Sequence, residues 1–392
     1  MRTKCLLVLS VLLILTATLH AQPDSLWSHT YHGRNIDEMP SIIQTRAGGY
    51  IISGATGASN GGNICGFLVK TDAKGNELWT REYQHINGFC GVIQISDSSF
   101  ILGGSFKSAA AGRGACLLKI DANGEQISLN IYGGAGADFI QTSDGGFALA
   151  SGKRIPKTVN DQIVLRKTDC NGNVQWEKEY GEEGREQCEA LIQTADGGFA
   201  LAGVTDSFKK QPKTLSQRDF YLARTDAEGN LLWSRNYGKE GRENNDCRSL
   251  VQTPDKGFAL AGMTNPSYKV SKGDLYLVKT DSVGNEMWSQ LYGGDGHEEG
   301  ASIIILAEGG FVLAGSTGYR TKEAGEYIRD YYLVRTDPYG TELWSRMFGG
   351  SGFNQCESVI QTSDGGFALI GNTSNGEGPN DFLLIKTGPV VK

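Results

Sequence analysis

Short apolar runs separated by polar, glycine-rich segments recur along most of the chain. In the unit near position 200 these runs span Ala190–Thr194, Phe199–Val204, Phe220–Thr225 and Leu231–Tyr237. Runs of this length and composition, bounded by turn residues, are typical of β-strands. A tight Asp-Gly-Gly turn joins the first two runs and a longer glycine-containing turn joins the last two, so consecutive strands should pair as antiparallel hairpins. The unit therefore predicts a four-stranded antiparallel sheet.

The unit occurs seven times, and an aromatic residue after the first turn marks each copy: Tyr50, Phe100, Phe147, Phe199, Phe258, Phe311 and Phe367. A second recurrent turn follows, with a tryptophan after it in most copies. All six tryptophans occupy this kind of position, counting Trp27 and Trp176, and unit two departs by carrying Ile127 there. Four strands repeated at roughly 50 residues are the signature of a β-propeller blade. We therefore expect an all-β fold, a seven-bladed β-propeller of four-stranded antiparallel blades.

The two ends of the repeat array complement each other. Leu26–Tyr31 matches the fourth strand of a unit, whereas Asp381–Lys386 matches the third strand, so the last unit lacks a fourth strand of its own. Pairing these two segments would cover two strand edges that otherwise invite aggregation. We expect the N-terminal strand to complete the last blade and so close the ring.

Residues 1–21 read MRTKCLLVLSVLLILTATLHA, two cations followed by a short apolar stretch and small residues. This pattern predicts a secretory signal peptide, and the stretch is too short for a membrane anchor. We expect residues 22–392 to form a single domain that is secreted, periplasmic or extracellular, is not inserted in a membrane, and is a monomer. Export would place seven cysteines in an oxidising compartment, and this odd number leaves at least one thiol unpaired or intermolecular.

Composition narrows the possible partners. The 392-residue chain has 54 glycines without the collagen period, 39% hydrophobic residues and a formal charge of −7. Such a chain can bury a core, and it lacks the clustered basic surface that nucleic acid requires. We expect no nucleic acid as partner.

The segments Lys70-Thr-Asp-Ala-Lys-Gly-Asn-Glu-Leu-Trp79 and Cys188-Glu-Ala-Leu-Ile-Gln-Thr-Ala-Asp-Gly-Gly-Phe-Ala-Leu-Ala-Gly203 resemble repeats of quinoprotein-like (PQQ-like) propellers and of exported bacterial and archaeal repeat propellers. The resemblance covers nearly the whole chain after residue 21 and implies architecture rather than activity. Quinoprotein dehydrogenases of this kind carry two adjacent cysteines at their cofactor. Because the chain has no Cys-Cys pair, we expect no quinone and no other cofactor.

Loops between second and third strands vary most in length, and they should share one face with the connections between units. They span Ala55–Ile64, Thr205–Gln217, Thr264–Lys272, Thr317–Arg329 and Asn372–Pro379. A rigid scaffold that presents variable loops on one face is suited to binding, although neutral drift in loop length is an equal alternative. The connections bring charged residues to the mouth of the channel, and the candidate ligand-binding rim is Glu186, Glu189, Asp246, Arg248, Glu298, Glu299 and Glu357. The alternative is a rim that is only solvated.

Two other recurrent residue types favour structural roles. Cys188, Cys247 and Cys356 occupy one repeat position, where they are small buried residues, partners in a disulfide between neighbouring blades, or a thiol cluster. Each Asp-x-x-Gly turn supplies a single aspartate, fewer oxygen ligands than calcium needs. We expect no metal site, and we expect the repeated glutamines to form hydrogen bonds between blades.

No catalytic motif accompanies the repeats. The chain after residue 21 has four histidines and no Gly-x-Ser-x-Gly nucleophile turn. The sequence favours an exported, non-enzymatic propeller that binds a protein or carbohydrate ligand on its variable-loop face. Two alternatives remain open, a carbohydrate-active enzyme (glycosidase or lyase) that uses rim carboxylates and a scaffold in cell-envelope assembly.

Overall fold

The computed structural model describes residues 22–34, 36–57, 64–108, 112–155, 161–181, 184–207, 218–238, 244–265, 273–320, 327–350, 352–374 and 380–389. Every regular element in these ranges is a β-strand, which confirms the all-β prediction. The predicted signal peptide lies outside them, as do most residues of the predicted variable loops. The segment predicted as a loop at 317–329 is partly strand, because β23 continues to Arg320 and β24 begins at Tyr327.

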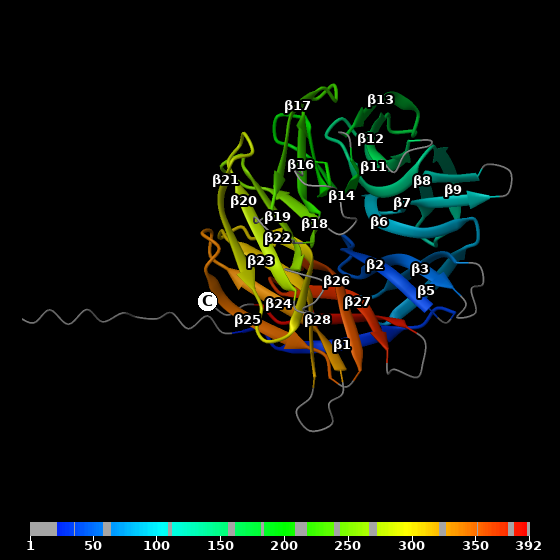
Figure 1. Cartoon of the computed structure of the whole chain (residues 1–392). Helices are drawn as coiled ribbons and strands as arrows, with labels where there is room; N and C mark the ends of the chain where they lie inside the picture. The colour runs from blue at the N-terminus through cyan, green and yellow to red at the C-terminus, as the bar shows by residue number, and fades with distance from the viewer. Residues whose placement is uncertain are drawn as a thin grey trace, which may run out of the picture.

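Successive groups of four antiparallel strands, which we call blades, are arranged around a common centre (Figure 1). Five blades are separate sheets, and the last two are joined into one eight-stranded sheet by a parallel bridge between Arg329 and Phe353. Blade 1 contains β2 (Ile36–Gln44), β3 (Tyr50–Gly57), β4 (Cys65–Thr71) and β5 (Glu77–Tyr83). Blade 2 contains β6 (Ile86–Ser96), β7 (Ser99–Ser108), β8 (Gly112–Asp121) and β9 (Gln126–Tyr132). Blade 3 contains β10 (Ala135–Gln141), β11 (Phe147–Arg154), β12 (Asp161–Thr168) and β13 (Val174–Tyr180).

The remaining strands follow the same order. Blade 4 contains β14 (Glu186–Gln193), β15 (Phe199–Thr205), β16 (Asp219–Thr225) and β17 (Leu231–Tyr237). Blade 5 contains β18 (Asn244–Gln252), β19 (Phe258–Asn265), β20 (Asp274–Thr280) and β21 (Glu286–Tyr292). Blade 6 contains β22 (His297–Ile305), β23 (Phe311–Arg320), β24 (Tyr327–Thr336) and β25 (Glu342–Phe348). Blade 7 contains β26 (Phe353–Gln361), β27 (Phe367–Ser374), β28 (Asp381–Thr387) and β1 (Ser25–Tyr31).

The N-terminal strand lies at the outer edge of blade 7, so the predicted pairing of 26–31 with 382–386 is confirmed. β1 pairs antiparallel with β28, with Tyr31 opposite Phe382 and Trp27 opposite Lys386. In Figure 1 the dark blue β1 lies beside the red end of the chain. Contacts also join blade 7 to blade 1, because the amide N–H of Ser363 donates to Gln44 Oε1 at 2.8 Å and that of Asp37 donates to the carbonyl of Asn380 at 2.9 Å.

Repeated side chains connect neighbouring blades. The tyrosine that ends a fourth strand donates its hydroxyl to a glycine carbonyl in the next blade, as in Tyr180 to Gly229 at 2.7 Å and Tyr292 to Gly340 at 2.6 Å. These turn glycines have φ near +80°, a conformation that other residues rarely adopt. The pairs are Tyr31–Gly75, Tyr83–Gly124, Tyr132–Gly172, Tyr180–Gly229, Tyr237–Gly284 and Tyr292–Gly340. Blade 6 ends instead on Phe348, which has no hydroxyl to donate.

Glutamines and tryptophans add further contacts between blades. The predicted inter-blade role of the glutamines is confirmed at Gln44, Gln94, Gln193 and Gln252, whose side-chain oxygens accept backbone N–H groups from a neighbouring blade. Trp176 and Trp233 pack edge-on against Phe199 and Phe258 of the following blade. The prediction that Ile127 occupies the tryptophan position of blade 2 was wrong, because Ser128 pairs with Lys119 as Trp176 pairs with Lys167.

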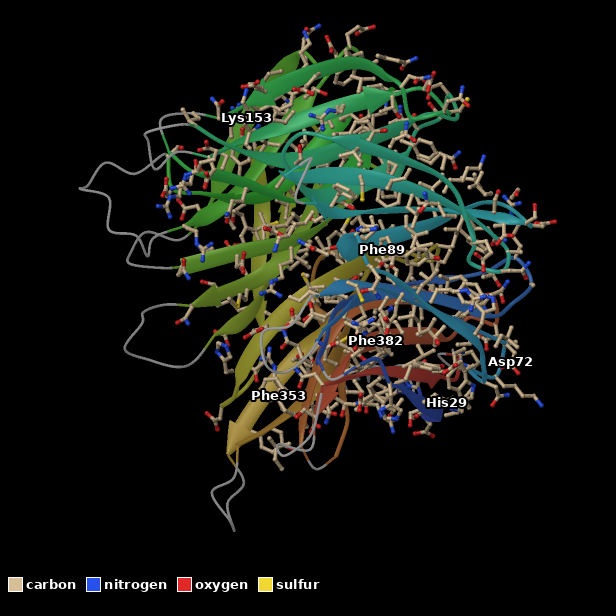
Figure 2. All side chains as sticks on the ribbon, turned by 90° about the vertical axis from the view of Figure 1, so that its right-hand side faces the viewer. His29, Asp72, Phe89, Lys153, Phe353 and Phe382 are labelled. Carbon is tan, nitrogen blue, oxygen red and sulfur yellow. The ribbon has the colours of Figure 1, made fainter. Side chains whose placement is uncertain are left out.

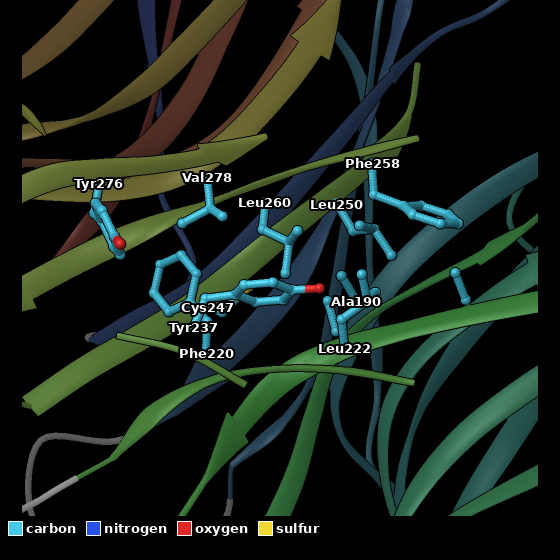
Figure 3. Close-up of a cluster of buried hydrophobic side chains, with 12 residues drawn as sticks. Ala190, Phe220, Leu222, Tyr237, Cys247, Leu250, Phe258, Leu260, Tyr276 and Val278 are labelled. Atoms are coloured by element: carbon cyan, nitrogen blue, oxygen red, sulfur yellow. The ribbon is translucent and has the colours of Figure 1, made fainter. Parts of the chain in front are cut away.

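The core consists of hydrophobic clusters shared by adjacent blades. One cluster joins blades 4 and 5 and includes Phe220, Tyr237, Cys247 and Leu260, all buried (Figure 3). Burying aromatic and aliphatic side chains between sheets is the main source of stability in such a fold. Each blade is therefore stabilised mainly by its two neighbours.

Candidate functional site

The channel lies between the first strands of the blades, which contact one another around the centre. We call the side that carries the blade-to-blade connections the connection face, and the side that carries the two short turns of each blade the turn face. In Figure 2, Lys153 and Phe353 lie toward one side of the molecule and Asp72, in a short turn, lies toward the other. The candidate rim residues all belong to first strands that start at the connection face.

An irregularity in the first strand turns single residues toward the channel. In five blades the register with the second strand skips one residue, a β-bulge of the kind that re-aims a side chain. In blade 1 it skips two neighbouring residues, and in blade 2 it skips single residues at three places. The skipped residues are Met39 with Pro40 in blade 1, Asn87, Cys90 and Ile95 in blade 2, and Ala137, Glu189, Arg248, Ala301 and Glu357 in the other five blades.

In blades 4 and 5 the bulge lies opposite a glycine of the Phe-x-Leu-x-Gly motif of the second strand, whereas blade 3 combines a bulge with Ser151 at this position and Gly136 opposite it. A Cβ at Gly203 would lie 1.9 Å from the carbonyl oxygen of Gln187, and a Cβ at Gly262 would lie 2.0 Å from that of Asp246. Only a residue without a side chain permits this approach. The glycine of the motif therefore makes room for the strand irregularity that presents Glu189 and Arg248.

The bulges open onto one cavity, the channel cavity, of about 810 Å³. Residues from the first strand of every blade line it. Blades 3, 4, 5 and 7 contribute acidic or basic residues, whereas blades 1 and 2 contribute Met39, Pro40, Phe89, Cys90 and Phe106. The cavity thus has one charged wall and one largely apolar wall.

The charged wall is organised around Arg248. Its guanidinium lies 3.4 Å from Asp246 Oδ2 and 3.8 Å from Glu357 Oε2, so one cation joins carboxylates of blades 5 and 7. Burial, followed by the neighbouring Asp246 carboxylate, raises the pKa of Glu189. Burial likewise raises the pKa of Glu357, and the positive charge of Arg248 opposes this effect.

Glu299 of blade 6 does not line the cavity but extends this charged wall beyond it, and it has two basic partners. His297 Nε2 is 3.1 Å from Glu299 Oε1, and the buried guanidinium of Arg329 forms an ion pair with Glu299 Oε2. Burial acts to raise the pKa of Glu299, but His297 and Arg329 outweigh it and lower the pKa to about 2. His297 Nδ1 accepts the N–H of Gly273 at 2.8 Å, so its Nε2 carries the proton that faces Glu299.

Two predicted rim residues lie elsewhere. Glu186 is fully buried and accepts hydrogen bonds from the hydroxyls of Thr205, at 2.9 Å, and Ser207. Glu298, also buried, accepts the hydroxyl of Thr317 at 2.7 Å. Neither lines the channel cavity, because each points toward the second strand of its own blade. The structure therefore brings together Glu189, Asp246, Arg248, Glu299 and Glu357, without Glu186 and Glu298.

The sequence did not single out Asp138 of β10 or Arg329 of β24. The Asp138 carboxylate accepts the N–H of Leu191 in the next blade at 2.8 Å, and burial raises its pKa to about 7. Arg329 also lies over the ring of Phe353, 5.1 Å from its centroid. One sequence signal was available: Glu189, Arg248 and Glu357 each directly follow a cysteine of the repeat.

Those cysteines are free thiols within the core. Cys188, Cys247 and Cys356 are buried, and each belongs to a hydrophobic cluster between blades. Burial raises the pKa of all three thiols well above the ordinary value. Of the three alternatives considered, the structure supports small buried residues rather than a disulfide.

Within the described ranges, no three His, Cys, Asp or Glu side chains are grouped so that they could hold a metal ion. Over the same ranges, no helix is long and apolar enough to cross a membrane.

No family model matches the sequence, and no curated protein matches it. Solved structures match it in fold. The β-propeller domain of the Trilobed protease from Pyrococcus furiosus has a TM-score of 0.50 at 9% identity, over 94% of this chain and 97% of that one. The chain has a β-propeller fold.

Two other structures share this propeller architecture. A polysaccharide lyase, an ulvan lyase, has a TM-score of 0.60 at 9% identity, over 93% of this chain and 97% of its own. An acylaminoacyl peptidase has a TM-score of 0.53 at 11% identity and matches 91% of this chain, which spans about half (51%) of the peptidase. At these identities the likeness concerns the fold alone.

Proposed function

We propose that this propeller is a non-enzymatic binding protein that holds a protein or carbohydrate ligand at the connection-face end of its channel. The observation that carries the proposal is the set of β-bulges that turn Glu189, Arg248 and Glu357, from three blades, onto one cavity. A concave site with few convergent polar groups and an apolar wall is typical of ligand recognition. Asp246 and Glu299 complete the charged wall.

The proposal includes a closed seven-bladed ring, a single domain over residues 22–392. Support comes from the pairing of β1 with β28 and from the hydrogen bond between Ser363 and Gln44 across 319 positions of the chain. It also includes export directed by residues 1–21 and action as a secreted, periplasmic or extracellular monomer. The apolar stretch after Arg2 and Lys4 supports this location.

The test compares two charge-matched triple variants. The channel variant carries Glu189→Gln, Asp246→Asn and Glu357→Gln, and it leaves Glu299 intact because that carboxylate pairs with the buried Arg329. The control variant carries Glu77→Gln, Glu228→Gln and Glu286→Gln, three exposed acids on the turn face. A glycan and peptide array identifies a ligand of the unaltered chain, and calorimetry then measures its affinity for all three proteins.

We expect the channel variant to lose about tenfold or more in affinity, because charge-assisted hydrogen bonds are lost. The control should bind as the unaltered chain does. Equal affinity in all three proteins would show that the charged wall is only solvated surface.

One observation favours a second function, a carbohydrate-active enzyme. In the charged wall the pKa of Glu299 is lowered to about 2 while that of Glu357 is raised, and carboxylates with opposite shifts can divide the roles of base and acid. Incubation with uronate-containing and neutral polysaccharides, followed by a reducing-end assay, tests this function. Release of reducing ends that disappears in Glu357→Gln would support it, and no release from any of them would exclude glycosidic cleavage of those substrates.

A further inference from the structure

A second cavity, the side cavity, lies between blades 5 and 6 at the connection face. Its volume is about 1020 Å³, and its lining includes the connection Gly293–Gly296, Glu298, Tyr319, Tyr332 and Met347. Of these residues, none lines the channel cavity. The side cavity is therefore separate from the site proposed above.

Glu298 places an unused acceptor in this cavity. The residue is 3% exposed, and its Oε1 accepts the Thr317 hydroxyl, but its Oε2 has no hydrogen-bond partner among the described residues. A buried carboxylate oxygen without a partner is costly, and a ligand that donates a hydrogen bond or carries a positive charge offsets that cost.

The glycine-rich connection lies close against this carboxylate and leaves no room there for side chains of its own. A Cβ at Gly293 would lie 2.5 Å from Glu298 Oε2, and a Cβ at Gly296 would lie 2.5 Å from Oε1. Side chains at these two positions would collide with the carboxylate. At the equivalent position of blade 4, the hydroxyls of Thr205 and Ser207 both donate to Oε1 of Glu186.

The rest of the lining suits an organic cation. Tyr319 is 37% exposed and donates its hydroxyl to Asp330 Oδ2 at 3.1 Å, and Met347 is also exposed. Asp274 adds negative charge near Glu298, and burial raises the pKa of Glu298 against smaller opposing effects of Thr317 and the Gly294 amide. Aromatic rings, a thioether and carboxylates together provide the electrostatic attraction and the apolar contact that an alkylammonium or guanidinium group needs.

We propose that the side cavity binds a basic side chain, lysine or arginine, of a partner polypeptide, with Glu298 Oε2 as the acceptor. The aliphatic part of that side chain lies along Tyr319 and Met347, and its charged end replaces the missing partner of Glu298.

The test uses methionine methyl resonances, because the chain has only 5 methionines and two of them report on different cavities. Met347 lines the side cavity and Met39 lines the channel cavity. The protein labelled with ¹³C-methyl methionine is titrated with a tetralysine peptide, with the same peptide acetylated on every lysine, and with cellobiose. We expect tetralysine alone to shift the Met347 resonance in a saturable way.

Variants locate the interaction. Glu298→Gln retains an oxygen for Thr317 but removes the charge, and we expect tetralysine to bind it about tenfold more weakly at Met347. Glu186→Gln, at the equivalent buried position of blade 4, is the matched control and should leave the Met347 titration unchanged. If Glu298→Gln fails to fold, Tyr319→Leu, at a half-exposed position, provides a second test. We expect this variant to weaken binding of tetralysine several-fold.

Four results would overturn the proposal: no shift of Met347, a shift of Met39 only, an equal response to the acetylated peptide or to cellobiose, or full-strength binding by a folded Glu298→Gln. A shift of Met39 only would leave the channel proposal intact, so the failures of the two proposals can be distinguished.

Discussion

A buried base in the third strand is paired with an acid in the short first turn of the same blade. Lys167 Nζ lies 2.7 Å from Asp144 Oδ2, and Lys279 Nζ lies 2.8 Å from Asp255 Oδ2. The lysines are almost fully buried while the acids are about half exposed. Each acid is therefore a counter-ion that compensates the positive charge of a buried ammonium group.

Asp144→Asn should lower the free energy of unfolding at pH 6 by about 1–2 kcal/mol, less than for a fully buried pair because Asp144 is partly solvated. The Lys167 hydrogen bond lowers the pKa of Asp144 to about 2, below its value of about 3.9 in the unfolded chain. The stabilisation is thus complete above about pH 4 and is lost as the pH falls toward 2.

Urea titrations at pH 6, 4 and 2.5 should show the difference between the two proteins shrinking with acidity. Asp97→Asn, which removes an exposed partner of Arg46, is the control and should change little at any pH. A difference that stays constant with pH would contradict the assigned role of Asp144.

At the scale of the element, the first strand of each blade has two functions that its bulge separates. Before the bulge its side chains contact the second strand, as Glu186 and Glu298 do, and at the bulge one residue points into the channel. In blades 4 and 5 a glycine of the second strand, Gly203 or Gly262, permits both arrangements. Channel chemistry can therefore vary at the bulge residue without disturbing the sheet.

Gly262→Ala should break this arrangement in blade 5. Its Cβ would meet the backbone oxygen of Asp246, which cannot rotate away, so we expect a loss of about 1–3 kcal/mol in unfolding free energy. Gly152→Ala, also in a second strand, meets no atom within 4 Å and should change stability by no more than about 0.5 kcal/mol. Chemical denaturation of both variants measures the contrast, and similar losses would show that the bulge does not require Gly262.

Repetition explains how much the sequence could predict. Strands, turns and inter-blade glutamines recur in register, so one copy supports the interpretation of the others, and these predictions were confirmed. The site was harder to predict, because the direction of a side chain changes at the bulge, and a cysteine directly precedes the bulge residue in blades 4, 5 and 7 but not in every blade. Glu298 and Glu299 are neighbours in sequence, and the alternation of side chains along a strand places them on opposite faces. That alternation is the reason why only one of the two carboxylates joins the charged wall.

At the scale of the whole molecule, β1 contacts both ends of the strand array. It pairs with β28 of blade 7. The ring centroids of Trp27 and of Tyr50 in blade 1 are 6.0 Å apart, and the Tyr31 hydroxyl donates to the carbonyl of Gly75 at 2.7 Å. One strand thus contributes a ladder of backbone hydrogen bonds to blade 7 and side-chain contacts to blade 1.

Deleting residues 22–33 should lower the melting temperature and produce oligomers, because the outer edge of β28 becomes free to pair with another chain. Tyr31→Phe is the control that keeps the strand and removes one hydrogen bond, and it should cost about 1 kcal/mol without oligomers. Thermal unfolding and light scattering after gel filtration measure both effects. A deletion variant that melts unchanged and elutes as a monomer would contradict this role of β1.

The position of β1 also has a consequence for the order of events during synthesis. The strand leaves the ribosome before every blade, yet its partner β28 is made last. Blades 1 to 6 can pair locally as they appear, whereas this final contact has a very large sequence separation and must form late. Through that whole interval the backbone of β1 stays unpaired, and Tyr31, which is buried in the folded protein, lacks its final contacts. Whether the nascent chain avoids aggregation then depends on what covers the free edges of β1 until β28 has been made.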